Sequence, residues 1–250
     1  MLEHWLPSLT LLDLAWLAFA VFLSGLARGF AGFGTALVYV PLAGLVLPPV
    51  WVIMSILVFD LIGPLPLVPE SLRNARRGDL IMLALGLCVG VPTGVWLLAD
   101  VDPTAFRWGT SILALLLLAV LVSGWRYAHY LRRSGVLGVG ALGGFLGGLA
   151  GVPGPPVILL YMSGPGRAAE VRATMNLYLL IFEAILIVVF AAFAMLAFEP
   201  LLIGVLLIAP YMLACWIGAK LFDPNRERLF RRVAYALIAG AALYGIPWHG

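Results

Sequence analysis

Charged residues are scarce in this 250-residue chain. Asp, Glu, Lys and Arg make up 11% of the residues, against about 25% in soluble proteins. Apolar residues make up 63% and the net charge is only +3, so neither the surface of a water-soluble domain nor a disordered chain fits this composition. So few basic residues form no stripe for nucleic acid. The composition predicts an all-α, polytopic integral membrane protein in contact with the lipid bilayer.

Cysteine and histidine are also scarce, and their positions exclude several kinds of site. Cys88 and Cys215 both lie inside apolar runs, which argues against a disulfide framework or a zinc site. His4, His129 and His249 are terminal or in loops, so no imidazole base lies at membrane depth beside a nucleophile. We therefore expect no enzyme, no metal and no cofactor.

The apolar runs are long enough to cross a bilayer several times, since one helical span needs about 20 mostly apolar residues. Two spans are predicted to contain an acid: 49–69 includes Asp60, and 171–198 includes Glu183. The other single spans are 80–99, 108–125, 200–219 and 233–250.

Two further regions, 14–47 and 134–163, are too rich in Gly and Pro for one straight helix. Gly and Pro interrupt helices, and interrupted backbone at membrane depth is tolerated only where protein shields it or where it lines a cavity. Each region is predicted to form two helical pieces that meet at a break.

An internal repeat relates the two halves of the chain. A shift of 119 residues aligns Gly25 with Gly144 and Gly29 with Gly148, and with a small gap Asp102-Pro103 falls on Asp223-Pro224. Each half then reads as a broken helix pair followed by three spans. The predicted division is an N-terminal transmembrane repeat at 1–124, a cytoplasmic linker at 125–133 and a C-terminal transmembrane repeat at 134–250.

The placement of basic residues predicts that the repeats are inverted. Thirteen of the fifteen Lys and Arg residues lie in four loops, 73–77, 126–133, 167–172 and 220–232, which the positive-inside rule places in the cytoplasm. Equivalent loops of the two halves then lie on opposite sides of a bacterial inner membrane, with both termini periplasmic. Inverted repeats suit alternating access, with a site where the broken pairs meet near the midplane. Arg107 is an exception, about one turn from the outer surface.

The glycine-rich breaks and the repeat resemble those of a known family. The segments are GLARGFAGFGTALVYVP (Gly25–Pro41), GGFLGGLAGVPGPPVILLY (Gly143–Tyr161) and the two Asp-Pro starts. Over about residues 12–247 the chain resembles the sulfite exporter TauE/SafE family, although three prolines surround its second break. The resemblance implies transport of a sulfur-containing anion such as sulfite or an organosulfonate.

The breaks supply most of the candidate substrate-binding residues. A helix N-terminus attracts anions through its free N–H groups and its dipole, and glycine lets an oxyanion approach the backbone. The alternative is that small residues such as Gly140, Gly144 and Gly148 serve tight helix packing. The candidates are Gly32, Phe33, Gly34 and Thr35 at the first break, and Gly151, Val152, Pro153 and Gly154 at the second.

Four polar residues at membrane depth complete the candidate set. Arg28 matches the geometry of a sulfonate, or else it caps the hairpin and reaches the cytoplasmic surface. Asn176 can face the same cavity. Asp60 and Glu183 are candidates for proton coupling; the alternative is structural, with Asp60 pairing with Arg28 and Glu183 bonding to Asn176 or Tyr178.

These features predict a secondary transporter that moves a small, sulfur-containing anion by alternating access, coupled to protons. Its expected partners are that anion and the bilayer, and self-association into a homo-oligomer stays open. Two alternatives stay open as well: a passive anion channel, and a membrane scaffold subunit without transport.

Overall fold

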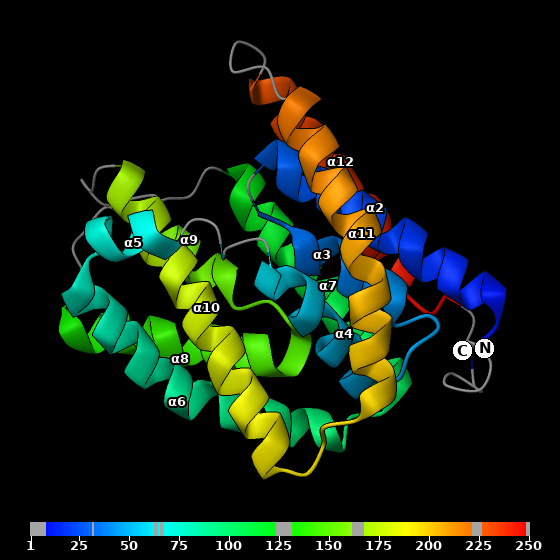
Figure 1. The fold of residues 1–250 in the computed structure, drawn as a ribbon, viewed down its shortest axis with the longest axis horizontal. Helices are drawn as coiled ribbons and strands as arrows, with labels where there is room; N and C mark the ends of the chain where they lie inside the picture. The colour runs from blue at the N-terminus through cyan, green and yellow to red at the C-terminus, as the bar shows by residue number, and fades with distance from the viewer. Residues whose placement is uncertain are drawn as a thin grey trace. The chain divides into compact units, whose positions relative to one another are not determined.

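The structure, a computed structural model, describes residues 9–31, 33–62, 65, 68–123, 132–161, 168–221 and 227–248. Regular secondary structure in these ranges is helical throughout, which confirms the all-α expectation (Figure 1). The helices are α2 (Leu11–Ala31), α3 (Thr35–Ala43), α4 (Pro49–Ile62), α5 (Val68–Asn74), α6 (Arg77–Ala99), α7 (Pro103–Ser123), α8 (Arg133–Ala150), α9 (Gly154–Tyr161), α10 (Ala168–Ala192), α11 (Phe198–Leu221) and α12 (Glu227–Gly245).

Six of the described helices are long and apolar enough to cross a membrane, namely α2, α6, α7, α8, α10 and α11. Many of their large apolar side chains face outward: Trp96 and Val188 are each 66% exposed, and Trp216 is 59% exposed. Outward apolar surface on this scale fits contact with lipid. The chain is therefore a multi-pass membrane protein. The expected span 233–250 lies on α12, which is outside this set and has Arg231 and Arg232 in its N-terminal half.

The expectation of a single span over 49–69 is wrong. α4 ends at Ile62, and a separate short helix, α5, follows from Val68. The intervening sequence contains Gly63, Pro64 and Pro66, and proline lacks the amide that a continuing helix needs. α4 is thus an apolar helix of 14 residues.

The helices gather into two compact units, each of which draws on both halves of the sequence. Unit 1 comprises Met1–Phe59, Val101–Val122 and Ala197–Gly250, and unit 2 comprises Asp60–Asp100 and Ser123–Leu196. Unit 1 therefore holds α2, α3, most of α4, α7, α11 and α12, whereas unit 2 holds α5, α6, α8, α9 and α10. These units differ from the predicted repeats at 1–124 and 134–250, and the division into repeats stays a prediction.

In unit 1, α2 packs closely against α11 through glycine. A Cβ atom placed on Gly25 would lie 2.8 Å from the carbonyl oxygen of Tyr211, and one on Gly29 would lie 2.7 Å from the Cα of Gly218. Because real Cβ atoms do not approach backbone so closely, glycine is required at this crossing. α3 and α12 pack against the same helix, α2.

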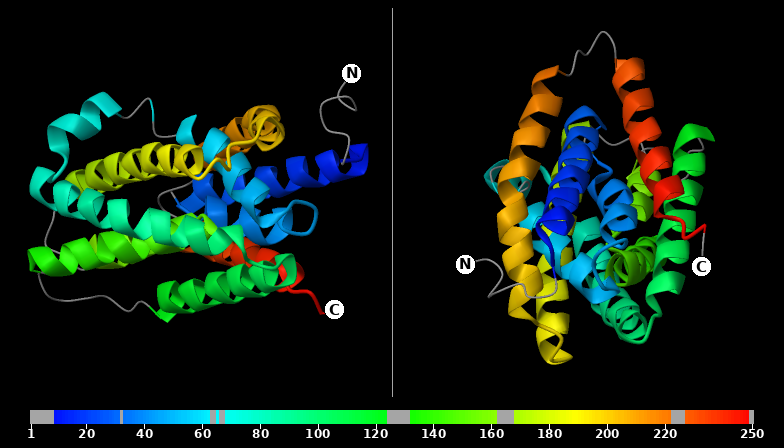
Figure 2. Two further views of the ribbon diagram at one scale, coloured as in Figure 1. Left: turned by 90° about the horizontal axis from the view of Figure 1, so that it is seen from below. Right: turned by 90° about the vertical axis from the view of Figure 1, so that its right-hand side faces the viewer.

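In unit 2, α8 packs against α6 in the same manner. A Cβ on Gly144 would lie 3.0 Å from the Val91 amide nitrogen, and one on Gly148 would lie 2.6 Å from the Val91 carbonyl oxygen. Gly140 is equally close to the backbone of Leu83. The packing interpretation of this glycine series therefore holds. Figure 2 shows α6, α8 and α10 running alongside one another.

The two glycine crossings involve positions that the repeat aligns. Gly25 and Gly29 of α2 correspond to Gly144 and Gly148 of α8 under the shift of 119 residues. Both pairs abut a helix from the other half of the chain, α11 for the first pair and α6 for the second. Each unit therefore has one close helix crossing at a glycine pair, and the repeat itself stays a prediction.

Candidate functional site

The first break separates α2 from α3. α2 ends at Ala31 and α3 begins at Thr35, with Gly34 as its N-cap in a left-handed conformation at φ 103°. A residue with a side chain rarely adopts this conformation, so glycine is needed here. Phe33 is half-buried at the same break, and Gly32 lies outside the described residues. The predicted break is confirmed at this position.

Arg28 in the last turn of α2 reaches across this break. Its Nη1 group donates a hydrogen bond of 3.2 Å to the hydroxyl oxygen of Thr35, the first residue of α3. The same Thr35 oxygen lies 3.1 Å from the hydroxyl of Tyr211 on α11. Thr35 and Tyr211 are buried and Arg28 is half-buried. The guanidinium is therefore held at the start of α3, in a polar cluster made by three helices.

A buried aromatic group holds this polar cluster in place. The ring of Phe59 on α4 lies between those of Tyr211 and Tyr39, with centroid separations of 4.9 Å and 5.0 Å. The Tyr39 hydroxyl is in turn 2.8 Å from the Ser55 hydroxyl, which donates to the carbonyl of Val52. Because these rings are fully buried, Tyr211 has little freedom to leave Thr35.

Several hydrogen-bond donors lie together at the first break. The first amides of a helix have no intrahelical acceptors, and the N-cap of α3 is Gly34, which has no side chain to cap them. A guanidinium and two hydroxyl groups stand next to these amides. Positive charge and several N–H and O–H donors around one helix N-terminus suit a small oxyanion.

The second break separates α8 from α9 and closes differently. Gly151 ends α8 with φ 69°, and its amide donates to the carbonyl of Gly147 over 2.8 Å. α9 begins at Gly154, so this break is also confirmed where it was predicted. The carbonyl of Pro153 accepts a hydrogen bond of 3.1 Å from the buried hydroxyl of Tyr178 on α10. Val152 and Pro153 are buried, so packing restrains the connecting segment.

The two breaks differ most at the position of the arginine. The residue aligned with Arg28 is Gly147, and a Cβ there would collide with the ring of Phe182. A phenylalanine ring thus packs beside the second break where the first has a guanidinium. At this aligned position the first break has a positive charge and the second has none.

Asn176, the remaining substrate-binding candidate, belongs to unit 2, whereas the cluster at the first break belongs to unit 1. Its side-chain amide donates to the Ser71 hydroxyl over 3.0 Å, linking α10 to α5. Nearby, Arg76 and Glu170 form an ion pair of 3.1 Å, and the Arg76 amide donates to Thr174. These bonds attach α5 and the start of α6 to α10, and the substrate-binding role of Asn176 stays a prediction.

The two acids expected to couple protons occupy unlike positions. Glu183 lies in the middle of α10 and is 6% exposed, as expected for an acid inside a span. Asp60 lies near the end of the short helix α4 and is half-buried, because α4 stops before the predicted span is complete. Glu183 is thus the better placed of the two acids for a role at membrane depth.

Sequence reasoning missed Tyr211 and Ser71 as partners in these clusters. Tyr211 follows Pro210 inside a long apolar run, and nothing in its neighbourhood marks it as polar. A tyrosine placed well inside an apolar run, away from the interfacial ends, was the available signal.

Broken helices within an all-helical membrane-spanning chain, one of them carrying an arginine at its break, are typical of membrane transporters. The model of the family described as Sulfite exporter TauE/SafE matches residues 17–245, and the chain belongs to this family. Members of this family are exporters rather than enzymes.

One curated relative gives a more specific comparison. The chain is 25% identical over 219 residues to a protein of Cupriavidus necator described as a probable sulfite/organosulfonate exporter TauE, and the match covers 84% of each chain. No solved structure matches the chain.

Proposed function

We propose that this transporter moves a small sulfur oxyanion, sulfite or an organosulfonate, and binds it at the first break. The observation that carries the proposal is the hydrogen bond from Arg28 to Thr35 at the N-terminus of α3. A guanidinium presents a planar set of donors that matches sulfonate oxygens, and the first amides of α3 add further donors. The description of the Cupriavidus necator relative supports this substrate class.

The proposal includes alternating access coupled to protons in a bacterial inner membrane, with both termini periplasmic. The interrupted helices α2–α3 and α8–α9 and the aligned glycine crossings support a mechanism based on two related halves. Glu183 is the proposed proton carrier, because a buried acid in the middle of a span is costly unless it has a function. Asp60 is the second candidate.

The test of substrate binding is flux into proteoliposomes that contain the purified protein. Sulfite, methanesulfonate and sulfate are supplied separately, and uptake is compared between wild type, Arg28→Gln and Arg28→Lys. We expect the Gln variant to lose at least about tenfold in sulfite or sulfonate flux, since a charge-assisted hydrogen bond contributes about 1.5–3 kcal/mol. The Lys variant keeps the charge but not the planar donors, and we expect intermediate flux.

The matched control is Arg77→Gln, which removes an exposed arginine at the start of α6. Its flux should equal that of wild type. Equal flux in wild type and Arg28→Gln, at equal thermal stability, would show that the first break is not the anion site. Absence of flux for every anion in the panel would instead support the scaffold alternative.

The test of coupling imposes a pH gradient on the same vesicles. Glu183→Gln and Asp60→Asn are compared with wild type for anion flux driven by the gradient and for flux driven by the anion's own gradient. A coupling acid should lose the first and retain the second. If wild-type flux follows only the anion's electrochemical gradient, the protein is a passive channel and the coupling proposal fails.

A further inference from the structure

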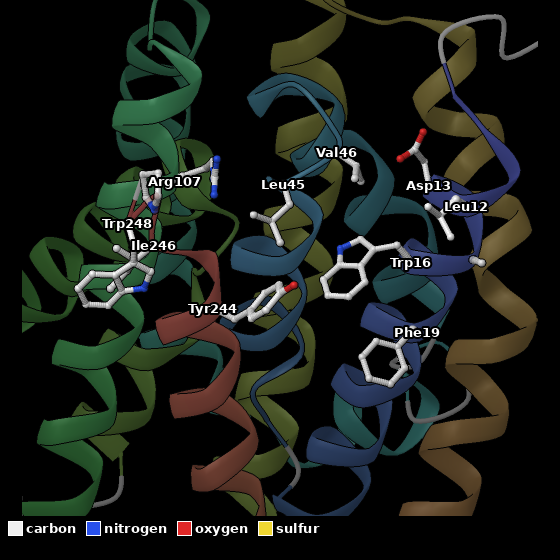
Figure 3. Close-up of a pocket in the computed structure, with 12 residues that line it drawn as sticks. Leu12, Asp13, Trp16, Phe19, Leu45, Val46, Arg107, Tyr244, Ile246 and Trp248 are labelled. Atoms are coloured by element: carbon white, nitrogen blue, oxygen red, sulfur yellow. The ribbon is translucent and has the colours of Figure 1, made fainter. Parts of the chain in front are cut away.

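A cavity at one end of unit 1 has no part in the proposed transport site. It has a volume of about 880 Å³, within the range of small-molecule sites. Its walls come from the start of α2, the segment after α3, the start of α7 and the end of α12 (Figure 3). The lining residues that matter most are Trp16, Phe19, Arg107, Tyr244 and Trp248, with Asp13 on the other side.

The cavity contains Arg107, the basic residue that departs from the charge pattern of the sequence. Its Nε–H donates to the carbonyl of Gly245 at the end of α12 over 3.3 Å. A Cβ on Gly44 would lie 3.5 Å from the Arg107 Cγ, so the stem of the side chain passes directly over this glycine. Within the described ranges no carboxylate forms an ion pair with Arg107. The hydrogen bond thus orients the guanidinium, and none of the described carboxylates neutralises its charge.

Aromatic side chains form the rest of the wall. The rings of Trp16 and Tyr244 lie 5.5 Å apart between centroids, and Trp16 also contacts Phe19 at 5.8 Å. The Trp16 indole N–H donates to the Leu42 carbonyl over 3.0 Å, which fixes the ring. Tyr244 is 62% exposed although its ring borders the cavity. This wall offers a hydrocarbon group a large apolar surface.

Asp13 is the acid among the described residues that line the cavity, and it is held away from the arginine. The Asp13 carboxylate accepts hydrogen bonds from the amide and the hydroxyl of Thr10, at 2.9 Å and 2.7 Å, in a reciprocal cap of α2. Figure 3 shows Asp13 and Arg107 on opposite sides of the cavity, with Leu45 and Val46 between them. An anion at the Arg107 end is therefore attracted by the guanidinium and does not contact the carboxylate of Asp13.

We infer that this cavity binds an amphiphilic anion, with an acidic headgroup on the Arg107 guanidinium and a hydrocarbon body against Trp16 and Tyr244. Two sources have this chemistry: an anionic phospholipid of the surrounding bilayer, and an organic sulfonate with a hydrocarbon group. The site is separate from the cluster at Arg28 and does not depend on the proposed transport function.

The test is a binding titration with the purified protein in a neutral detergent, followed by tryptophan fluorescence and calorimetry. The probes are hexanesulfonate, the uncharged analogue hexanol, and methanesulfonate as the headgroup alone. We expect hexanesulfonate to bind at least about tenfold more tightly than either of the other probes, and Arg107→Gln to lose about tenfold in affinity. Arg107→Lys should bind with intermediate affinity, and Arg77→Gln should bind like wild type. The same series in an Arg28→Gln background removes any binding of the probes at the first break.

Two results would overturn the inference. One is equal affinity of hexanesulfonate for wild type and Arg107→Gln; the other is binding of hexanol as tight as that of hexanesulfonate. Because Arg107→Gln also removes a bond to α12, Tyr244→Leu serves as a second variant that keeps the arginine, and it should weaken hexanesulfonate but not methanesulfonate. Displacement of the probe by phosphatidylglycerol and not by phosphatidylcholine would assign the site to lipid, and failure of both to displace it would assign the site to the free organic anion.

Discussion

Adding one methyl group at Gly29 or Gly148 should separate the helices at each glycine crossing. The nearest atom to a Cβ on Gly29 is the Gly218 Cα at 2.7 Å, followed by the Cys215 carbonyl at 2.8 Å. Ordinary contact begins near 3.4 Å, so α2 and α11 must move apart by about 0.7 Å. All these neighbours are backbone atoms, which no change of side-chain rotamer can move away.

Overpacking of this kind destabilises by about 1–3 kcal/mol. In a chain of this length 1 kcal/mol shifts the melting temperature by about 2–4 °C, so a cost of about 2 kcal/mol lowers it by about 4–8 °C. At Gly29 there is also a functional effect. The contact of Thr35 with Tyr211 measures 3.1 Å, and a displacement of α11 by about 0.7 Å stretches it beyond hydrogen-bond length. Gly29→Ala should therefore lower anion flux as well as stability.

The assay is thermal unfolding of purified variants followed by tryptophan fluorescence, with proteoliposome flux alongside. Gly138→Ala is the matched control, since Gly138 lies on the same helix as Gly148 and a Cβ there meets nothing within 4 Å. Alanine is a better helix former than glycine by about 1 kcal/mol, so the control should be as stable as wild type or slightly more. Gly29→Ala and Gly148→Ala variants as stable as Gly138→Ala would refute the close packing.

Three further substitutions test individual contacts. Tyr211→Phe should reduce anion flux and lower stability by about 0.5–1.5 kcal/mol, because it removes one hydrogen bond from the cluster; flux and melting temperature measure this. Gly34→Ala should destabilise by about 1–2 kcal/mol, since a side chain at φ 103° is strained; a melting temperature equal to that of wild type would contradict the left-handed cap. Glu170→Gln removes the ion pair with Arg76, whose side chain is 26% exposed, and should change stability by less than about 1 kcal/mol.

The helix breaks were predictable from sequence because their cause is local. Gly34 and Gly151 adopt left-handed conformations that glycine alone adopts readily, and the prolines that follow Gly151 exclude a continuous helix there. The long spans were predictable for the same kind of reason, since the length and composition of an apolar run decide them. The span predicted over 49–69 is wrong because composition alone does not show where a helix ends, and α4 ends at Ile62, directly before Gly63 and Pro64 in the sequence.

The residues that contact each other from different helices could not be predicted from the sequence, because these contacts depend on how distant segments pack. Tyr211 is 176 residues from Thr35, and no local pattern joins the two positions. The role of Gly147 shows the same limit: its sequence neighbourhood matches that of Arg28, yet Phe182 from another helix fills the space beside it. Hydrophobic periodicity identifies helices and their apolar faces, but it does not identify which helix packs against a given face.

At each of the two glycine crossings, a helix from one half of the chain packs against a helix from the other half. α11, from the second half, packs on Gly25 and Gly29 of α2, and α6, from the first half, packs on Gly144 and Gly148 of α8. Neither half contains the partner of its own glycine pair, so each half alone leaves a closely packing helix surface uncovered. The predicted repeat is therefore compatible with two helix pairs, each made of one helix from either half of the chain, and not with two independent bundles. A single chain holding both halves supplies each unit with the helix that its glycines require.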